Sequence, residues 1–99
     1  MLQVPMYSAV NEHAQLTGLS TMKTVDIPAP ANAVLVQAIT QNVRIKLKGN
    51  ATSAQGFRIT AGADAVLIPT GGSKSFTVQE ETASATLEYQ FIKVQGMGY

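Results

Sequence analysis

Strict alternation of apolar and polar side chains is the feature that most constrains the fold of this chain. Residues 43–48 read Val-Arg-Ile-Lys-Leu-Lys, so that each apolar side chain is followed by a basic one. Successive side chains of a β-strand point to opposite faces, and a period of two therefore predicts a strand with one buried face. The other face of this strand is basic and should face solvent.

The same alternation occurs over shorter stretches at 57–59 and 74–79, and the longest run is 83–94. In that last run the apolar phase changes at Phe91 and Ile92, which predicts a bulge or a bend there. Each of these runs is expected to place one row of side chains in the core. The expected buried face includes Val43, Ile45, Phe57, Ile59 and Leu87.

Two further segments, 34–39 and 66–68, are apolar on both faces, which is typical of strands covered on both sides or buried at a subunit contact. A strand is also expected at 22–27, before Pro28. Glycines and prolines separate these runs at the spacing of about 8 to 12 residues that is usual in sandwiches and barrels. We therefore predict an all-β fold: a jelly-roll-like antiparallel β-sandwich of about seven strands over residues 22–99.

The segment before this domain, residues 1–21, is expected to form an N-terminal arm. A weak apolar stripe at Ser8–Leu19 allows a short helix, but an extended or irregular arm fits the pattern better. The arm begins with apolar side chains that show no core periodicity, and these can add to a neighbour's sheet edge or groove or belong to a frayed terminus. The candidate contacts in this segment are Leu2, Val4, Met6 and Tyr7.

Charge and hydropathy exclude several classes of partner. Only 13% of the residues are charged, and the seven basic and six acidic side chains are scattered. No dense positive face can form, so nucleic acid is not an expected partner. No apolar run approaches the roughly 18 residues that span a bilayer, and the first residues lack the pattern of a secretory signal. We therefore expect synthesis in the cytoplasm and no membrane partner.

Side chains that carry chemistry are sparse. His13 is the only histidine and there is no cysteine, so neither residue type can build a catalytic or metal-binding cluster within one chain. The adjacent acids Glu80 and Glu81 are expected in a solvated loop. Residues 69–74 contain two glycines and a lysine, but their spacing is that of a turn rather than of a phosphate loop. We expect no enzymatic activity, no cofactor and no metal.

One local cluster of basic side chains stands out, namely Arg44, Lys46 and Lys48, with Arg58 expected on a neighbouring strand. Such a row can be a solvated strand face that also discourages edge-to-edge aggregation. Alternatively, it can dock onto an acidic protein surface, where charge mainly affects encounter rate and register.

Residues 33–62 contain an apolar strand ending in Gln, an Asn-Val-Arg strand, a short Gly/Ala/Thr loop and a Gly-Phe strand closed by Ala-Gly. A Thr/Ala-rich strand that ends in aromatic residues follows at 82–91. In this order the motifs resemble a family of small all-β virion structural proteins of tailed bacteriophages and prophages. The resemblance extends over residues 32–92. It departs from the family pattern at Ile45, where an aromatic is common, and in the neutral loop at 50–55.

The resemblance implies a structural role in the virion, as a head decoration or cement protein that binds the head surface and stabilises the particle. It implies the major capsid protein or other virion proteins as partners. Closed cyclic assembly is a common way to remove sheet edges, so the chain is also expected to bind copies of itself, as a trimer. The alternatives are a neck, tail or fibre component, or a host-surface carbohydrate-binding β-module.

Overall fold

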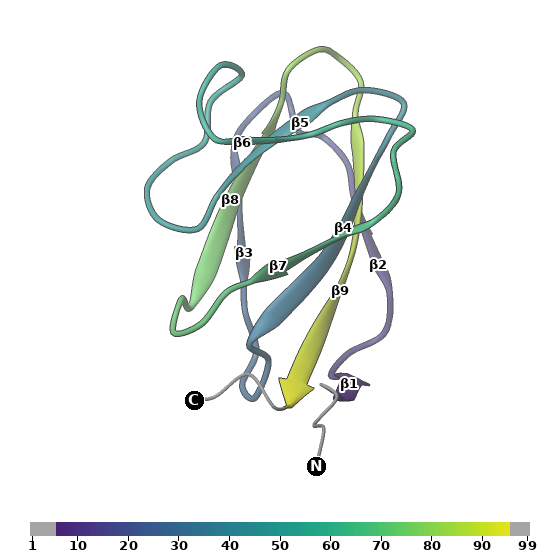
Figure 1. Ribbon diagram of the computed structural model, residues 1–99. Helices are drawn as coiled ribbons and strands as arrows, with labels where there is room; N and C mark the ends of the chain where they lie inside the picture. The colour runs from purple at the N-terminus through teal and green to yellow at the C-terminus, as the bar shows by residue number, and fades with distance from the viewer. Residues whose placement is uncertain (1–5, 96–99) are drawn as a thin grey trace.

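The computed structural model describes residues 6–95 and has nine strands in two antiparallel sheets that pack face to face (Figure 1). The strands are, in chain order, β1 Met6–Ala9, β2 Ala14–Leu16, β3 Lys23–Asp26, β4 Ala33–Ile39, β5 Val43–Lys46, β6 Phe57–Ile59, β7 Val66–Pro69, β8 Ser75–Glu80 and β9 Thr86–Gln95. One sheet has the order β1-β9-β4-β7, with β2 also on β9, and the other has the order β3-β8-β5-β6.

The strand pairs are nested in the way that defines a jelly roll. Strands β1 and β2 pair with β9, β3 pairs with β8, β4 with β7 and β5 with β6, as if one long hairpin had its tip between β5 and β6. The hairpin is then rolled so that β4 also pairs with β9 and β5 with β8. If β1 and β2 are counted as one interrupted strand, this gives the four-plus-four arrangement of a jelly roll. The all-β, jelly-roll-like prediction is confirmed.

The seven strands expected from alternation and from apolar runs are all present, with small shifts of their ends. The two others, β1 and β2, come from the segment expected as an arm. Ala14 lies opposite Tyr89 and Leu16 opposite Leu87, and the N–H of Val10 donates to the carbonyl of Phe91 at 2.9 Å. The described part of residues 1–21 is thus hydrogen-bonded to the sandwich, and it is extended rather than helical.

The main core lies between the two sheets. β4 contributes Val34, Val36 and Ala38 to it, all at most 1% exposed. The ring of Phe76 on β8 contacts two aromatic rings of β9, with centroids 6.2 Å from Tyr89 and 6.4 Å from Phe91. Four of the five residues expected in the core are buried, namely Val43, Ile45, Ile59 and Leu87.

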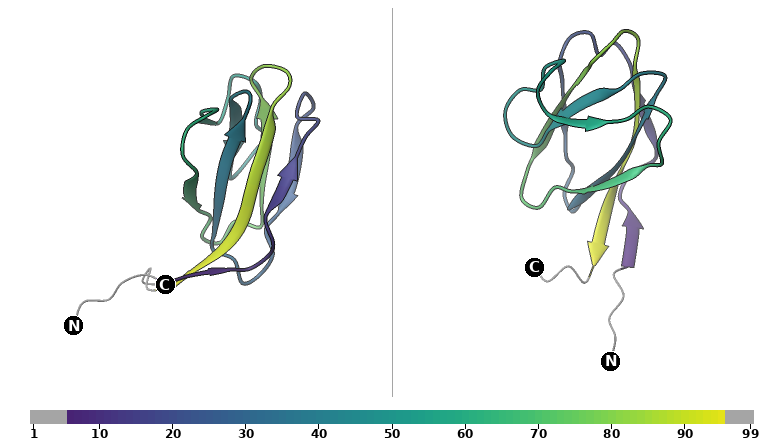
Figure 2. Two further views of the ribbon diagram at one scale, coloured as in Figure 1. Left: turned by 90° about the vertical axis from the view of Figure 1, so that its right-hand side faces the viewer. Right: turned by 45° about the horizontal axis from the view of Figure 1, so that its top comes forward.

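A bulge or a bend was expected near Phe91 and Ile92. No bulge is present on the β4 side, because the pairing with β4 advances one residue at a time from Thr86 to Ile92. On the other edge of β9 the register shifts by two residues between the Tyr89–Ala14 and Ile92–Ala9 pairs, so the ladder is interrupted between β2 and β1. Figure 2 shows β9 curving towards its C-terminal end. Ile92 and Val94 lie on the outer face of the sheet, where they form a second buried cluster with Ala33 of β4. The change of apolar phase therefore marks a second small core and not a break in the strand.

The far end of β9 forms a ribbon with β1 that reaches past the other strands (Figure 2). Asn32 supports it where the backbone pairing of β4 ends. The Asn32 side chain donates from Nδ2 to the carbonyl of Val94 at 2.9 Å and accepts at Oδ1 from the N–H of Val94 at 2.8 Å. The same residue accepts at its backbone carbonyl from the N–H of Thr70 at 2.9 Å, which ties the turn after β7 to β9.

Phe57 was expected in the core but is 71% exposed. It lies opposite Ile45, so its register is that of the inner face. However, β6 is an edge strand, and Figure 1 shows β6 near the top and β7, the neighbouring edge of the other sheet, lower down. The inner face of β6 is therefore poorly covered at this point. Alternation predicts which face of the sheet a side chain is on, but it does not predict whether another part of the chain covers that face.

The pair Phe57 and Ile45 provides a direct test of this placement. We expect Ile45→Ala to lower the free energy of unfolding by about 2 to 5 kcal/mol through a buried cavity. Phe57→Ala should cost no more than about 1 kcal/mol, because an exposed side chain leaves no cavity. Urea denaturation of both variants measures the difference. Equal losses would contradict the exposed position of Phe57.

Candidate functional site

The two arginines of the expected basic cluster are held by one carboxylate. Arg44 on β5 lies directly opposite Arg58 on β6, an arrangement in which like charges destabilise a sheet. Glu81 offsets this repulsion, because its Oε2 accepts from Nε of Arg58 at 2.8 Å and from Nε of Arg44. Arg44 also donates from Nη1 to the carbonyl of Gly56 at 3.0 Å. The arginines are therefore part of the scaffold.

The hydrogen bond from Arg58 is the main reason why the pKa of Glu81 lies below its ordinary value, and Arg44 lowers it further against the opposing effect of desolvation. The neighbouring acid, Glu80, does not lie in solvent as expected. It is 7% exposed, and its Oε1 accepts from the N–H of Ala85 at 3.0 Å. Glu80 thus stabilises the turn between β8 and β9.

The lysines of the cluster have a different environment from the arginines. Lys46 and Lys48 line an open groove of about 390 Å³ together with Leu47, Gly56 and Phe57. A second groove, of about 210 Å³, shares residues 46–48 and adds Lys74. In residues 6–95, ion pairs are found only for His13, Arg44 and Arg58, so the three lysines have no carboxylate partner there. We call Lys46, Leu47, Lys48, Phe57 and Lys74 the Lys46–Phe57 surface.

The loop at 47–56 is tied to the outer face of its sheet, which fixes Lys48 beside Phe57. Thr77 on β8 is the anchor, because its hydroxyl donates to the carbonyl of Gly49 at 2.8 Å and accepts from the N–H of Ala51 at 2.9 Å. Gly56 has a φ of 125°, and a Cβ there would lie 3.0 Å from the carbonyl oxygen of Ile45. Only glycine allows this close approach before β6. No sequence pattern indicated this role of Thr77.

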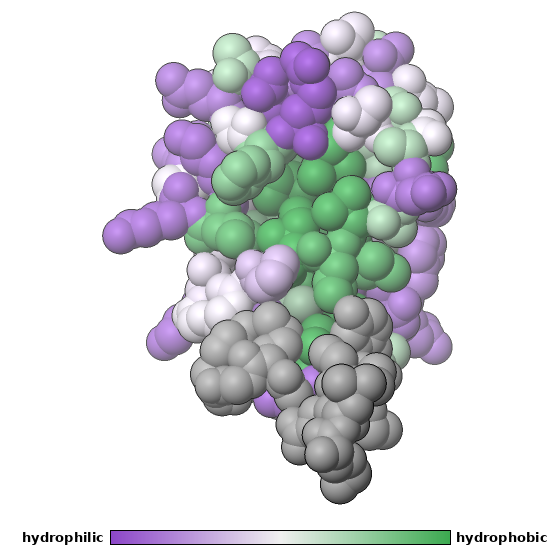
Figure 3. Space-filling view, viewed as in Figure 1, coloured by the Kyte–Doolittle hydropathy of each residue, from purple (hydrophilic) through white to green (hydrophobic). Residues whose placement is uncertain are grey.

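The face seen in Figure 3 carries a continuous apolar area over β7 and β4, below β6. Val66, at the start of β7, is 45% exposed and is, after Phe57, the second large exposed apolar side chain in the described part of the chain. Its neighbours on β7 divide between the two cores: Leu67 packs against the outer cluster and Ile68 against the inner one. None of the four residues of β7 is buried, so this segment, expected to be apolar on both faces, is only partly covered within the described residues.

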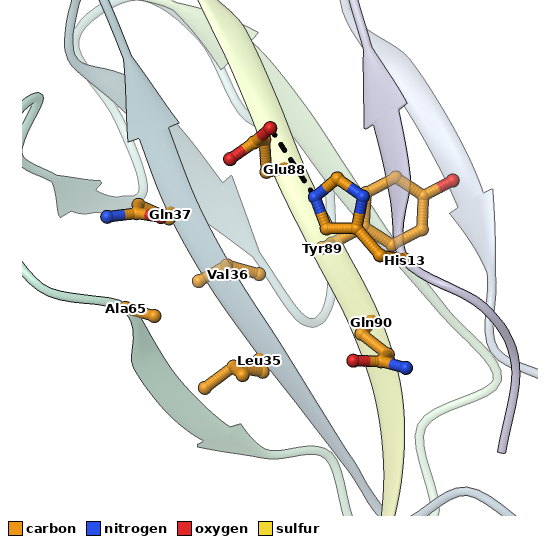
Figure 4. A pocket seen from close by; sticks show the side chains of 8 residues that line it. All are labelled: His13, Leu35, Val36, Gln37, Ala65, Glu88, Tyr89 and Gln90. Carbon is orange, nitrogen blue, oxygen red and sulfur yellow. Dashed lines mark ion pairs between the residues drawn. The ribbon is translucent and has the colours of Figure 1, made fainter. Parts of the chain in front are cut away.

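His13 lines a shallow groove of about 70 Å³ that extends across β9 to Leu35 on β4 and to Ala65, just before β7 (Figure 4). Its Nε2 is 3.4 Å from Oε2 of Glu88, which also accepts from Nε2 of Gln15 at 2.6 Å. Gln90 is engaged too, because its Nε2 donates to the carbonyl of Asn11 at 2.9 Å. Figure 4 shows one hydroxyl near this groove, that of Tyr89, and in the described residues no hydrogen bond joins it to His13. The arrangement is that of a surface hydrogen-bond network.

The remaining candidate contacts lie at the N-terminus. Leu2 and Val4 are outside the described residues. Met6 and Tyr7 belong to β1, where they pair with Gln95 and Val94. This pairing places both at the projecting ribbon and away from the Lys46–Phe57 surface.

Within residues 6–95, no three His, Cys, Asp or Glu side chains come together as a metal site. No helix that could cross a membrane is found there either. Comparisons with protein-family models, with curated proteins and with solved structures found no match. The fold and the surfaces of the protein are therefore the observations that bear on its function.

The ion pairs of Glu81 give a testable dependence of stability on pH. Because the pKa of Glu81 is lowered by folding, its contribution is complete above the ordinary value of 4.5 and is lost as pH falls through the folded-state pKa. We expect Glu81→Gln to melt at a lower temperature than the parent at pH 7, with the difference shrinking below pH 4.5. Thermal melts across this range check it, with the exposed Glu12→Gln as control. A constant difference at all pH values would contradict the assignment.

Proposed function

We propose that this chain is a structural protein of a tailed-phage virion, acting as a capsid decoration protein that binds the head surface and stabilises the particle. The observation that carries the proposal is the jelly roll with a projecting ribbon, made of β1 and the end of β9. Jelly rolls recur in viral capsids. A ribbon with an edge strand can add to the sheet of a neighbour through backbone hydrogen bonds.

The distribution of polar groups also favours a binding role over a catalytic one. Where the structure describes buried or clustered acids, they have structural partners: Glu80 holds a turn and Glu81 pairs with two arginines. A protein that binds a capsid needs a complementary surface and exposed strand edges, and it does not need catalytic acids or bases. The motifs at 33–62 and 82–91 that resemble phage virion proteins lie on β4 to β6 and on β9, the strands that build both sheets.

A neck, tail or fibre position remains the alternative within the same class. The exposed ring of Phe57 favours a second candidate, a carbohydrate-binding module, because sugars stack on exposed aromatic rings. The groove at Phe57 is lined by lysines and apolar groups and lacks a carboxylate or amide that could accept from sugar hydroxyls. A capsid decoration protein is therefore the better proposal.

Particles of the phage or prophage that encodes this chain provide the test. We expect gradient-purified particles to contain the chain in many copies. Deletion of its gene should leave particles that assemble but release DNA at a lower temperature, because a bound protein stabilises the state that it binds. Addition of the purified protein should restore heat resistance. Particles that lack the protein would exclude the virion role, and its presence on tails alone would favour the alternative.

The trimer proposed for the free protein is tested separately. We expect sedimentation equilibrium to give three times the chain mass of 10.5 kDa. Removal of residues 1–9 deletes β1 together with the candidate contacts Leu2, Val4, Met6 and Tyr7, and should convert the trimer to monomer. Truncation must stop before Leu19, which is fully buried. A full-length protein that sediments as a monomer would contradict self-assembly.

A further inference from the structure

Phe57 is the most exposed large apolar side chain in residues 8–95, and its surroundings are those of a contact residue. Leu47 and the glycine before Phe57 line the same groove, so the ring belongs to an apolar floor and does not stand alone. Exposed aromatic groups of this kind are enriched at the centres of protein interfaces. The loop below the ring is fixed by Thr77, which means that the floor is formed before any partner binds.

The charges around this floor have one sign. Lys46 and Lys48 line the groove of Phe57, and Lys74 lines the groove beside it. The nearby carboxylate of Glu81 is already bonded to Arg44 and Arg58 and cannot neutralise the lysines. Ammonium groups on flexible stems beside an apolar floor favour a partner that brings carboxylates next to an apolar side chain.

The backbone adds a third feature, because β6 is an edge strand. Extended segments bind to such edges through main-chain hydrogen bonds, and their alternate side chains fit the neighbouring pockets. A second copy of this chain is a poor occupant in the symmetric arrangement. Two β6 edges would bring Arg58 and the lysines of one copy against those of the other, and like charges disfavour that pairing.

We propose that the Lys46–Phe57 surface binds an extended acidic segment of another protein, which seats an apolar side chain on Phe57 and places carboxylates at Lys46, Lys48 and Lys74. The inference rests on the proposed function for the identity of that protein, which is a component of the virion surface. Binding of the segment itself is a property of this surface and is measured without particles.

The probe is a fluorescein-labelled peptide that alternates Glu or Asp with Leu, and its binding is followed by fluorescence anisotropy. We expect binding that weakens as NaCl is raised, because exposed charges are screened beyond about 10 Å at 0.1 M salt. Phe57→Ala should weaken binding by about fivefold or more, as expected for a central aromatic contact. The double variant Lys46→Glu, Lys48→Glu should weaken it by about tenfold or more, because charge pairs become repulsive.

Matched controls separate this surface from general effects of charge and hydropathy. The double variant Lys23→Glu, Lys93→Glu changes the net charge by the same amount as the double variant of the surface, but its two substitutions lie on β3 and β9. Val66→Ala truncates the other exposed apolar side chain. Both should leave binding within about twofold of the parent, the usual range for changes outside the contact. Circular dichroism melts of every variant exclude unfolding as the cause of a loss.

Three outcomes overturn the inference. The first is no binding of the acidic peptide, or equal binding of the variants. The second is equal binding of a peptide with Ser in place of Leu, or tighter binding of single-stranded DNA, since either would show a general anion site. The third is self-association that Phe57→Ala abolishes, which would make a second copy the occupant. If the protein coats particles but Phe57→Ala and the double lysine variant coat them equally, this inference fails while the proposed function stands.

Discussion

Pairing on both sides of β9 is the constraint on which the rest of the structure depends. This ten-residue strand is hydrogen-bonded to β4 along one edge and to β2 and β1 along the other. Its inner aromatic side chains, Tyr89 and Phe91, contact Phe76 of the facing sheet. Its outer side chains, Ile92 and Val94, belong to the second cluster. Because β9 contributes side chains to both cores and pairs with three strands, the rest of the long hairpin packs around it.

Continuous apolar runs predicted the strands at 34–39 and 66–68, and the first of these contributes Val34, Val36 and Ala38 to the main core. Alternation predicted the strands at 43–48, 57–59, 74–79 and 83–94, since a period of two reports burial of one face. It could not find β1 and β2, because Met6–Ala9 and Ala14–Leu16 are short and carry little pattern. Their place in the sheet depends on pairing with the edge of β9, a tertiary contact that the local sequence does not report. The same limit applies to the change of apolar phase at Phe91 and Ile92, because an apolar outer face cannot be told from a bulge unless the second cluster is known.

The candidate surface was predicted in part. The spacing at 43–48 placed Arg44 and Lys46 on one face, as the structure has them. Nothing local indicated that Glu81, 37 residues from Arg44, would neutralise one half of the cluster and leave the other half available. The prediction that Phe57 is buried was wrong for a related reason. The face of its side chain follows from the pairing with Ile45, whereas its exposure depends on the absence of cover at an edge.

The nested pairing also determines where contact surfaces can lie. Strands β4, β5, β8 and β9 have neighbours on both sides, so their backbone groups and inner side chains are committed to the sandwich. Apart from the edge strands β3 and β7, the surfaces that remain for binding are at the two ends of the long hairpin. The tip has the 47–56 loop and β6, and the base has β1 and the end of β9. Figure 1 shows the tip at the left and the base at the bottom. One surface offers cations beside an aromatic ring and the other offers a backbone edge. Because they differ in chemistry and share no residue, attachment to a foreign protein and assembly with other copies need not compete for the same surface.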